Sequence, residues 1–149
     1  MYSTDRTDGQ RSARRMINCV SNYLTDPVRR ALAHSGLIDI TTTGRRTGLP
    51  RRIEIVFHVF DGRIYISGLP RADRRRSWLA NLERQPTFTF HLKGPIRADL
   101  PATARVITDP DERARVMSRI IESAWHGQNL AAMVAHSPLV EVTVDGVAA

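Results

Sequence analysis

The residues best suited to chemistry in this chain lie in a short basic segment, GRRTGLPRR, from residue 44 to residue 52. It combines two glycines and a proline with four arginines, so the backbone can turn tightly while several guanidinium groups converge. A planar guanidinium donates two hydrogen bonds at once to phosphate or carboxylate oxygens, and glycine lets backbone N–H groups approach the same oxygens. The segment therefore predicts an anion-binding turn, although a solvated hairpin end fits its composition equally well.

A second basic cluster comes further along the chain. Arg71 and the consecutive arginines at 74–76 precede Trp78, and we expect Asp73 to cap a helix that carries the three arginines in its first turn. The helix macrodipole disfavours cations at a helix N-terminus, so this arrangement favours a bound anion that compensates them. A local destabilisation with no ligand is the alternative.

Motifs for other kinds of catalysis are absent from the sequence. The single cysteine, Cys19, cannot form an internal disulfide, and there is no H-E-x-x-H, nucleophile elbow or phosphate loop. The five histidines are scattered, and packing or surface roles explain each of them. We therefore expect no metal site and assign no catalytic residue. If the protein is an enzyme, a bound cofactor must supply the chemistry.

Composition places the chain among globular proteins. It has 149 residues, 42% of them hydrophobic, and no apolar run approaches the length of a membrane-spanning helix. We expect residues 1–10 to be disordered and residues 11–149 to form one domain without integral membrane contact. The polar N-terminus lacks the apolar core of a signal peptide, which predicts a cytoplasmic location. The net charge of +7 predicts an anionic ligand: nucleic acid, a membrane surface, or a phosphorylated or carboxylated cofactor.

The basic turn has to be positioned by the strands around it. Apolar residues alternate between Ile53 and Val59 and again at Ile64 and Ile66, which is typical of strands with one buried face, and Asp61-Gly62 between them indicates a hairpin. Further strands are expected at 38–43, 87–92, 96–107 with a bend or bulge at Pro101, and 139–144, and helices at 13–24, 26–35, 73–85, 109–126 and 128–135. The pattern predicts an α+β fold, a small antiparallel barrel of about six strands with flanking helices.

The order of several short motifs resembles a known family. TTTGRRTGLPR at residues 41–51 is followed by Asp61-Gly62, by W-x-x-N-L at residues 78–82 and by T-D-P-x-E-R-A at residues 108–114. This order resembles the deazaflavin-dependent nitroreductase and quinone reductase family. The resemblance implies a split β-barrel that binds coenzyme F-420, whose phosphate and oligoglutamate tail are anionic. It also implies hydride transfer from the reduced ring to a quinone, a nitroaromatic compound or a similar acceptor.

The resemblance also implies a binding site. Arg46 and Arg51 match positions that hold the anionic part of the cofactor, and Trp78 matches an aromatic residue beside it, with a core role as the alternative. The full set of expected cofactor-binding residues is Arg45, Arg46, Thr47, Arg51, Gly68, Arg71, Arg75, Arg76 and Trp78. The family's Ser-Lys-Gly loop is replaced by SGLPR at residues 67–71. A late tyrosine is also absent, and Trp125 and His126 in about that place are the expected substrate-binding residues.

Three functions are compatible with these residues. The first is a reductase that uses reduced deazaflavin, and the second is a split-barrel reductase that uses flavin mononucleotide (FMN). A homodimer is compatible with either. The third is a non-catalytic basic barrel for single-stranded nucleic acid, but Phe60 and Tyr65 are too few to form the exposed aromatic platform of such barrels. Nucleic acid is therefore not the expected partner.

Overall fold

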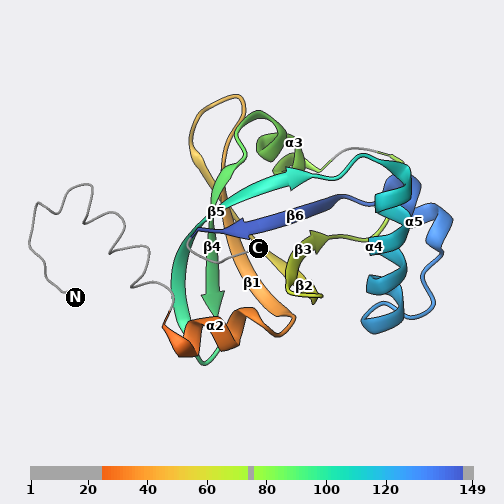
Figure 1. Ribbon diagram of the computed structural model, residues 1–149. Helices are drawn as coiled ribbons and strands as arrows, with labels where there is room; N and C mark the ends of the chain where they lie inside the picture. The colour runs from red at the N-terminus through yellow and green to blue at the C-terminus, as the bar shows by residue number, and fades with distance from the viewer. Residues whose placement is uncertain (1–24, 74–75, 146–149) are drawn as a thin grey trace, which may run out of the picture.

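A closed antiparallel barrel forms the centre of the molecule (Figure 1). The computed structural model describes residues 25–73 and 76–145. The strands are β1 (Gly36–Thr43), β2 (Pro50–Phe60), β3 (Arg63–Ser67), β4 (Thr87–Lys93), β5 (Arg97–Val106) and β6 (Leu139–Val144). They pair in the order β1-β2-β3-β6-β5-β4, and β4 pairs back to β1. The predicted α+β barrel of six strands is confirmed.

Helices cover three sides of the barrel. Within the described residues they are α2 (Asp26–Leu32), α3 (Ser77–Arg84), α4 (Pro110–Ser123) and α5 (Leu130–His136). In Figure 1, α3 lies beside the loop that joins β1 to β2, α2 lies below the barrel, and α4 and α5 lie together at the right. None of these helices is long and apolar enough to cross a membrane. The helix expected at 13–24 and the disorder expected at 1–10 fall outside the described residues.

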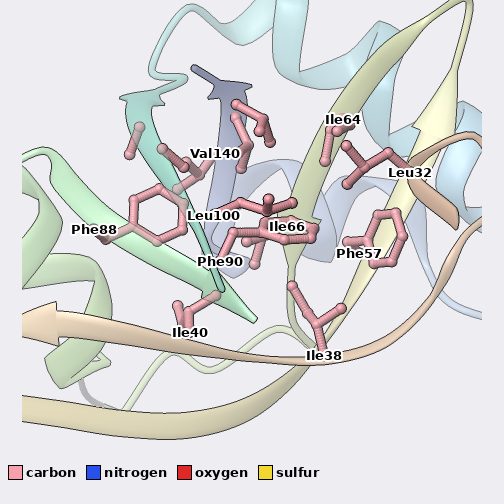
Figure 2. Packing of buried hydrophobic residues seen from close by; sticks show 14 of the residues in the cluster. Leu32, Ile38, Ile40, Phe57, Ile64, Ile66, Phe88, Phe90, Leu100 and Val140 are labelled. Atoms are coloured by element: carbon pink, nitrogen blue, oxygen red, sulfur yellow. The ribbon is translucent and has the colours of Figure 1, made fainter. Parts of the chain in front are cut away.

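The interior of the barrel is apolar, as strand alternation predicts. Ile38, Ile40, Phe57, Phe90 and Leu100 are among the side chains that converge there (Figure 2), and each is at most 2% exposed. Phe57 and Phe90 meet edge to face with ring centroids 5.2 Å apart. The barrel therefore encloses a packed core and not a channel.

The hairpin between β2 and β3 also forms as its sequence predicts. Asp61 and Gly62 both have positive φ, 54° and 75°, which suits a two-residue hairpin turn. On β3 the alternation fails, since residues 64–67 are buried consecutively. The outer side belongs to a second apolar cluster in which Tyr65 joins residues of α4, α5 and β6, and Phe60 packs against it. These two aromatic residues therefore form no exposed stacking platform.

The start of α3 corrects one prediction about the site. The helix begins at Ser77 with Arg76 in the N-cap position and no side-chain cap. Asp73 does not cap it, because its carboxylate pairs with Arg71, Nη2 to Oδ2 at 3.0 Å. The arginines at 74–76 therefore precede the first turn of the helix. The predicted cap and the predicted place of these arginines within the first turn are wrong, and anion binding beside them stays a prediction.

Two other local predictions differ from the structure. The sequence predicts Asp26 as the cap of α2, with Pro27 at the first helical position. The cap is instead Thr25, whose hydroxyl accepts a hydrogen bond from Val28 N at 3.4 Å. The expected bulge at Pro101 is absent, because the β4–β5 register runs without a break from Thr87–Lys93 to its partners on β5. In contrast, of the two caps that the sequence offers for α4, Thr108 and Asp109, the structure has Asp109, which accepts from Glu112 N at 2.9 Å.

Candidate functional site

The basic turn between β1 and β2 is closed by its own backbone. Gly44 N donates to Leu49 O at 2.8 Å, and Gly48 N donates to Gly44 O at 2.8 Å. Gly48 has a φ of 75°, which side-chain-bearing residues rarely adopt. At Gly44, a Cβ would lie 2.9 Å from Thr47 Oγ1 and 3.1 Å from Leu49 O. The two glycines therefore set the shape of the turn, each for a different steric reason.

Asn81 of α3 fastens this turn to the barrel. Its Oδ1 accepts hydrogen bonds from Arg45 N at 3.0 Å and from Arg45 Nη1 at 3.2 Å, and its Nδ2 donates to Thr42 Oγ1 at 3.1 Å. Asn81 is 3% exposed, so these bonds are largely shielded from water. Sequence reasoning placed Asn81 in the W-x-x-N-L motif but missed this role. The available signal was its i, i+3 spacing from Trp78, which puts both residues on one face of the helix.

A pocket of about 540 Å³ lies between the turn and the first turns of α3. Its lining comprises Thr42, residues 44–47 and residues 50–53, together with Ser77, Trp78 and Asn81. We call it the turn pocket. Five of the expected cofactor-binding residues meet here: Arg45, Arg46, Thr47, Arg51 and Trp78. The structure therefore joins the two motifs that the sequence keeps about thirty residues apart.

The turn pocket is positively charged, and part of that charge is available to a ligand. Within residues 25–73 and 76–145, four arginines line it and no carboxylate does. Arg52 pairs with Asp39, Nε to Oδ2 at 2.9 Å, and Arg45 bonds the neutral amide of Asn81. The side chains of Arg46 and Arg51 are exposed and have no hydrogen-bond or ion-pair partner within the described part of the chain. These two guanidinium groups can bind an anion without breaking an existing contact.

Trp78 belongs to both the barrel core and the turn pocket. It is 8% exposed and packs within the main apolar cluster, yet it also contributes to the lining of the pocket. The two roles considered from the sequence are therefore combined in one side chain. Replacing Trp78 will disturb folding as well as binding, because the same ring serves both.

A second cavity, of about 700 Å³, shares no lining residue with the turn pocket. It lies among the opposite side of α3, the end of β5, the start of α4 and residues 134–139. Arg71 and Arg76 line it, so these two expected residues lie apart from the other five. Gly68 adjoins Arg76, because a Cβ there would lie 3.0 Å from the Arg76 Cζ. Arg75 falls outside the described residues.

The arginines of the second cavity already have partners. Arg71 pairs with Asp73, and Arg76 donates to Leu69 O at 2.7 Å. Arg113 donates to four backbone carbonyls, including Val134 O at 2.8 Å and Ile107 O at 2.9 Å. Burial lowers the pKa of both Arg76 and Arg113. The guanidinium groups on this side of α3 are thus largely hydrogen-bonded or ion-paired within the protein.

Trp125 and His126 line neither the turn pocket nor the second cavity. Trp125 packs edge-on against His58, with ring centroids 5.0 Å apart, and His126 is exposed. His58 is 1% exposed, and its Nε2 has no partner among the described residues. Burial lowers the pKa of His58 to about 4. The structure does not bring the expected substrate-binding pair together with the cofactor residues.

The turn pocket can bind and orient a ligand but offers it no acid or base. None of the described histidines, aspartates and glutamates belongs to its lining. No group of three or more potential metal ligands occurs among the described residues. The lining offers guanidinium groups and the hydroxyl groups of Thr42, Thr47 and Ser77, a set that suits phosphate and carboxylate oxygens.

Comparison of the sequence with protein families gives this arrangement a context. A profile of the F420H(2)-dependent quinone reductase family matches residues 14–146. The chain belongs to this family. It is an oxidoreductase whose cofactor is coenzyme F420, and the FMN alternative has less support. No curated protein matches the sequence.

Three solved structures illustrate the shared fold. A candidate 5-nitroimidazole antibiotic resistance protein from Bacteroides thetaiotaomicron is 14% identical with a TM-score of 0.59, over 82% of this chain and 80% of that one. An F420-H2 dependent reductase is 18% identical with a TM-score of 0.52, over 72% and 93%. A protein described as a domain-swapped dimer is 18% identical with a TM-score of 0.54, over 91% and 100%. At these identities the likeness establishes the fold alone.

Proposed function

We propose that the turn pocket holds the anionic part of reduced F420 and so orients the cofactor for hydride transfer to a quinone or nitroaromatic acceptor. One observation carries this assignment: four arginines line the pocket without a carboxylate, and Arg46 and Arg51 have no partner in the described part of the chain. A site whose guanidinium groups are exposed and unpaired is arranged for an anionic ligand.

The residues present fit this cofactor better than they fit FMN. A single phosphate needs one or two arginines, whereas a phosphate with an oligoglutamate tail presents several charges to the four arginines of the turn pocket. The chemical fit therefore agrees with the family to which the chain belongs.

Each residue of the turn pocket has a task in this proposal. When bound, the reduced deazaflavin supplies the hydride. Arg46 and Arg51 bind its anionic oxygens, and Asn81 positions Arg45 through two hydrogen bonds. Trp78 provides an apolar wall beside the ligand. Because no acid or base of the described part of the chain lines the pocket, binding and orientation are what these residues contribute there.

The remaining expected residues stay predictions. Arg71, Arg76 and Gly68 form a second contact region for the same cofactor in this proposal, because Arg76 directly precedes Ser77 of the turn pocket. Substrate binding by Trp125 and His126 has no support from the two cavities.

We further propose a homodimer, since a domain-swapped dimer matches 91% of this chain. Sedimentation velocity tests that state. The cytoplasmic location also stays a prediction.

Titration with three ligands tests the proposed function. Tryptophan fluorescence is followed while F420, F420 without its glutamates, or FMN is added at low and at high salt. We expect F420 to bind most tightly and its affinity to fall as salt rises, because exposed ion pairs are screened over about 8–10 Å at ordinary ionic strength. Equal affinity for F420 and its glutamate-free form would show that the arginines do not bind the oligoglutamate tail.

A further inference from the structure

The second cavity has an apolar floor at the end of the barrel. Ile107, directly after β5, and Leu139, the first residue of β6, are both 0% exposed and line the cavity. Leu79 of α3 and Val134 of α5 add apolar sides. Its volume of about 700 Å³ is that of a small-molecule site, and such sites are lined mostly by apolar groups. The cavity can therefore hold an organic molecule with an apolar body.

Ser137 adds an unpartnered hydroxyl group to the lining of this cavity. It lies between α5 and β6 and is 4% exposed. Its Oγ is shielded from water and has no hydrogen-bond partner among the described residues. A buried hydroxyl without a partner costs free energy, and native proteins usually provide one. Rotation about a single side-chain bond redirects this hydroxyl, so a ligand in the cavity can become the missing partner.

Arg113 places a positive charge beside Ser137. Its Nη2 donates to the backbone oxygen of Ser137, and its three other hydrogen bonds also go to backbone carbonyls. A guanidinium has five N–H groups, so one of them has no partner in the described part of the chain. Because each partner is a neutral carbonyl, none of these contacts neutralises the charge. Burial lowers the pKa of Arg113, as expected for a cation that is shielded from water without a carboxylate beside it.

The other charges of the cavity do not balance Arg113. Among the described lining residues, three are arginines and one, Glu83, is a carboxylate. Asp73 pairs with Arg71 from outside the lining. With Asp73 counted against Arg71 and Glu83 against another arginine, one positive charge is left over. The Arg71 side chain is 37% exposed, which places it at the rim of the cavity and leaves the floor to Arg113 and its neighbours.

We propose that the second cavity binds an apolar organic acid with a single carboxylate, independently of the cofactor in the turn pocket. The carboxylate accepts hydrogen bonds from Ser137 Oγ and from the remaining N–H of Arg113, and it supplies the negative charge that the lining lacks. The apolar body of the acid packs against Ile107 and Leu139. The acid lies below the arginines of the rim, so it and F420 bind at the same time.

Isothermal titration calorimetry of the full-length protein with 2-naphthoate tests the proposal. We expect naphthoate to bind without F420 and to keep its affinity when F420 is present. The neutral isostere 2-naphthamide should bind at least about tenfold more weakly, because it brings no charge to Arg113. Ser137→Ala should weaken naphthoate binding about tenfold, as expected for one hydrogen bond to a charged group. Ser118→Ala, at an exposed serine of α4, is the matched control and should bind normally.

Two tryptophan variants locate the bound acid. Ala135→Trp fills the second cavity from α5 and should abolish naphthoate binding. Ala131→Trp places the same ring at an exposed position of that helix outside the lining, and it should bind naphthoate normally. Circular dichroism checks that both variants keep the fold. Ser137→Ala gives a second check, because it removes an unpartnered hydroxyl and is not expected to destabilise the protein.

Four results would overturn the proposal. The first is no binding of naphthoate, and the second is equal binding of naphthoate and naphthamide. The third is normal affinity in both Ser137→Ala and Ala135→Trp. The fourth is displacement of naphthoate by F420 or its loss in Arg46→Ala, since either would place the acid in the cofactor site. F420 binding is measured separately, so a failure of the proposed function would be seen apart from these results.

Discussion

The turn pocket and the second cavity lie on opposite sides of α3, and both are rich in arginine, yet their charges serve different purposes. In the turn pocket, Arg46 and Arg51 are exposed and have no partner in the described part of the chain. In the second cavity, Arg113 bonds four backbone carbonyls and Arg71 pairs with Asp73. The first set of charges is open to a ligand, and the second mainly stabilises the fold.

The difference shows that the partners of an arginine, more than the number of arginines nearby, indicate its function. A guanidinium surrounded by backbone carbonyls satisfies helix and strand ends that would otherwise lack donors. The guanidinium groups of Arg46 and Arg51, on the basic turn, bond no such carbonyls in the described part of the chain. Five expected outcomes test or sharpen this contrast, and they follow from the largest effect to the smallest.

Arg113→Ala should lower the free energy of unfolding by about 2–4 kcal/mol, because it leaves several shielded carbonyls without a donor. These carbonyls include Ile107 O, directly after β5, and Val134 O of α5. Urea denaturation measures the loss. Arg115→Ala, on the exposed side of the same helix, is the control and should change stability little. A stable Arg113→Ala protein with weakened cofactor binding would reverse our assignment of this residue.

Arg46→Ala and Arg51→Ala should each weaken F420 binding by about 1.5–3 kcal/mol, the range for hydrogen bonds to charged groups. The unfolding midpoint should stay unchanged, because neither side chain has a hydrogen-bond or ion-pair partner among the described residues. Fluorescence titration gives the affinities, with Arg115→Ala again as the matched control. If all three variants bind F420 alike, the turn is solvated surface and the contrast between the two regions fails.

The buried His58 on the α4 side should make stability depend on pH. Its folded-state pKa of about 4 lies below its usual 6.5, so protonation favours the unfolded chain. The stabilisation is complete above pH 6.5 and is lost as the pH falls towards 4. Between pH 8 and pH 5 the loss should be about 2 kcal/mol. Urea denaturation at both pH values measures it, and His58→Leu should remove this part of the pH dependence.

The exposed His126 provides the comparison for this experiment. His126→Ala should retain the full loss between pH 8 and pH 5, because it leaves the buried imidazole of His58 unchanged. An unchanged pH dependence in His58→Leu would mean that other groups cause it. Affinity for F420 at pH 8 should be the same in both histidine variants, since neither residue lines the turn pocket.

Asn81→Ala should affect both stability and binding, each by about 1–2 kcal/mol. The variant removes the acceptor for Arg45 N and the donor to Thr42 Oγ1, so the turn loses its anchor on α3. Denaturation and F420 titration measure the two effects. Asn81→Asp keeps the acceptor and should recover most of the binding. A stability loss with normal affinity would restrict Asn81 to a structural role.

Gly68→Ala should have the smallest effect, below about 1 kcal/mol on stability, because the atom it displaces belongs to the flexible side chain of Arg76. The displaced guanidinium makes the variant a mild test of the second cavity. If Arg76 contacts the cofactor, F420 affinity should fall while the unfolding midpoint barely moves. Unchanged affinity would leave cofactor binding to the turn pocket alone.

Local signals in the sequence determined much of this protein. Alternation between Ile53 and Ile66 and the Asp61-Gly62 turn gave the β2–β3 hairpin, because side-chain period and positive φ are properties of a few neighbouring residues. The same holds for the Asp109 cap of α4. The family could also be recognised from the sequence, because its motifs are short and occur along this chain in the order typical of the family. The basic turn and Trp78 then appear at one pocket, as the resemblance implied.

Tertiary structure decided which of the candidate residues meet and which charges are free. Asp73 looked like a helix cap, but its pairing with Arg71 and the later start of α3 depend on how the loop packs. Seven of the nine expected cofactor residues line one of the two cavities, and Gly68 lies beside the second cavity. They divide in this way because the two cavities lie on opposite sides of α3. Such contacts join residues far apart along the chain, and no local pattern encodes them.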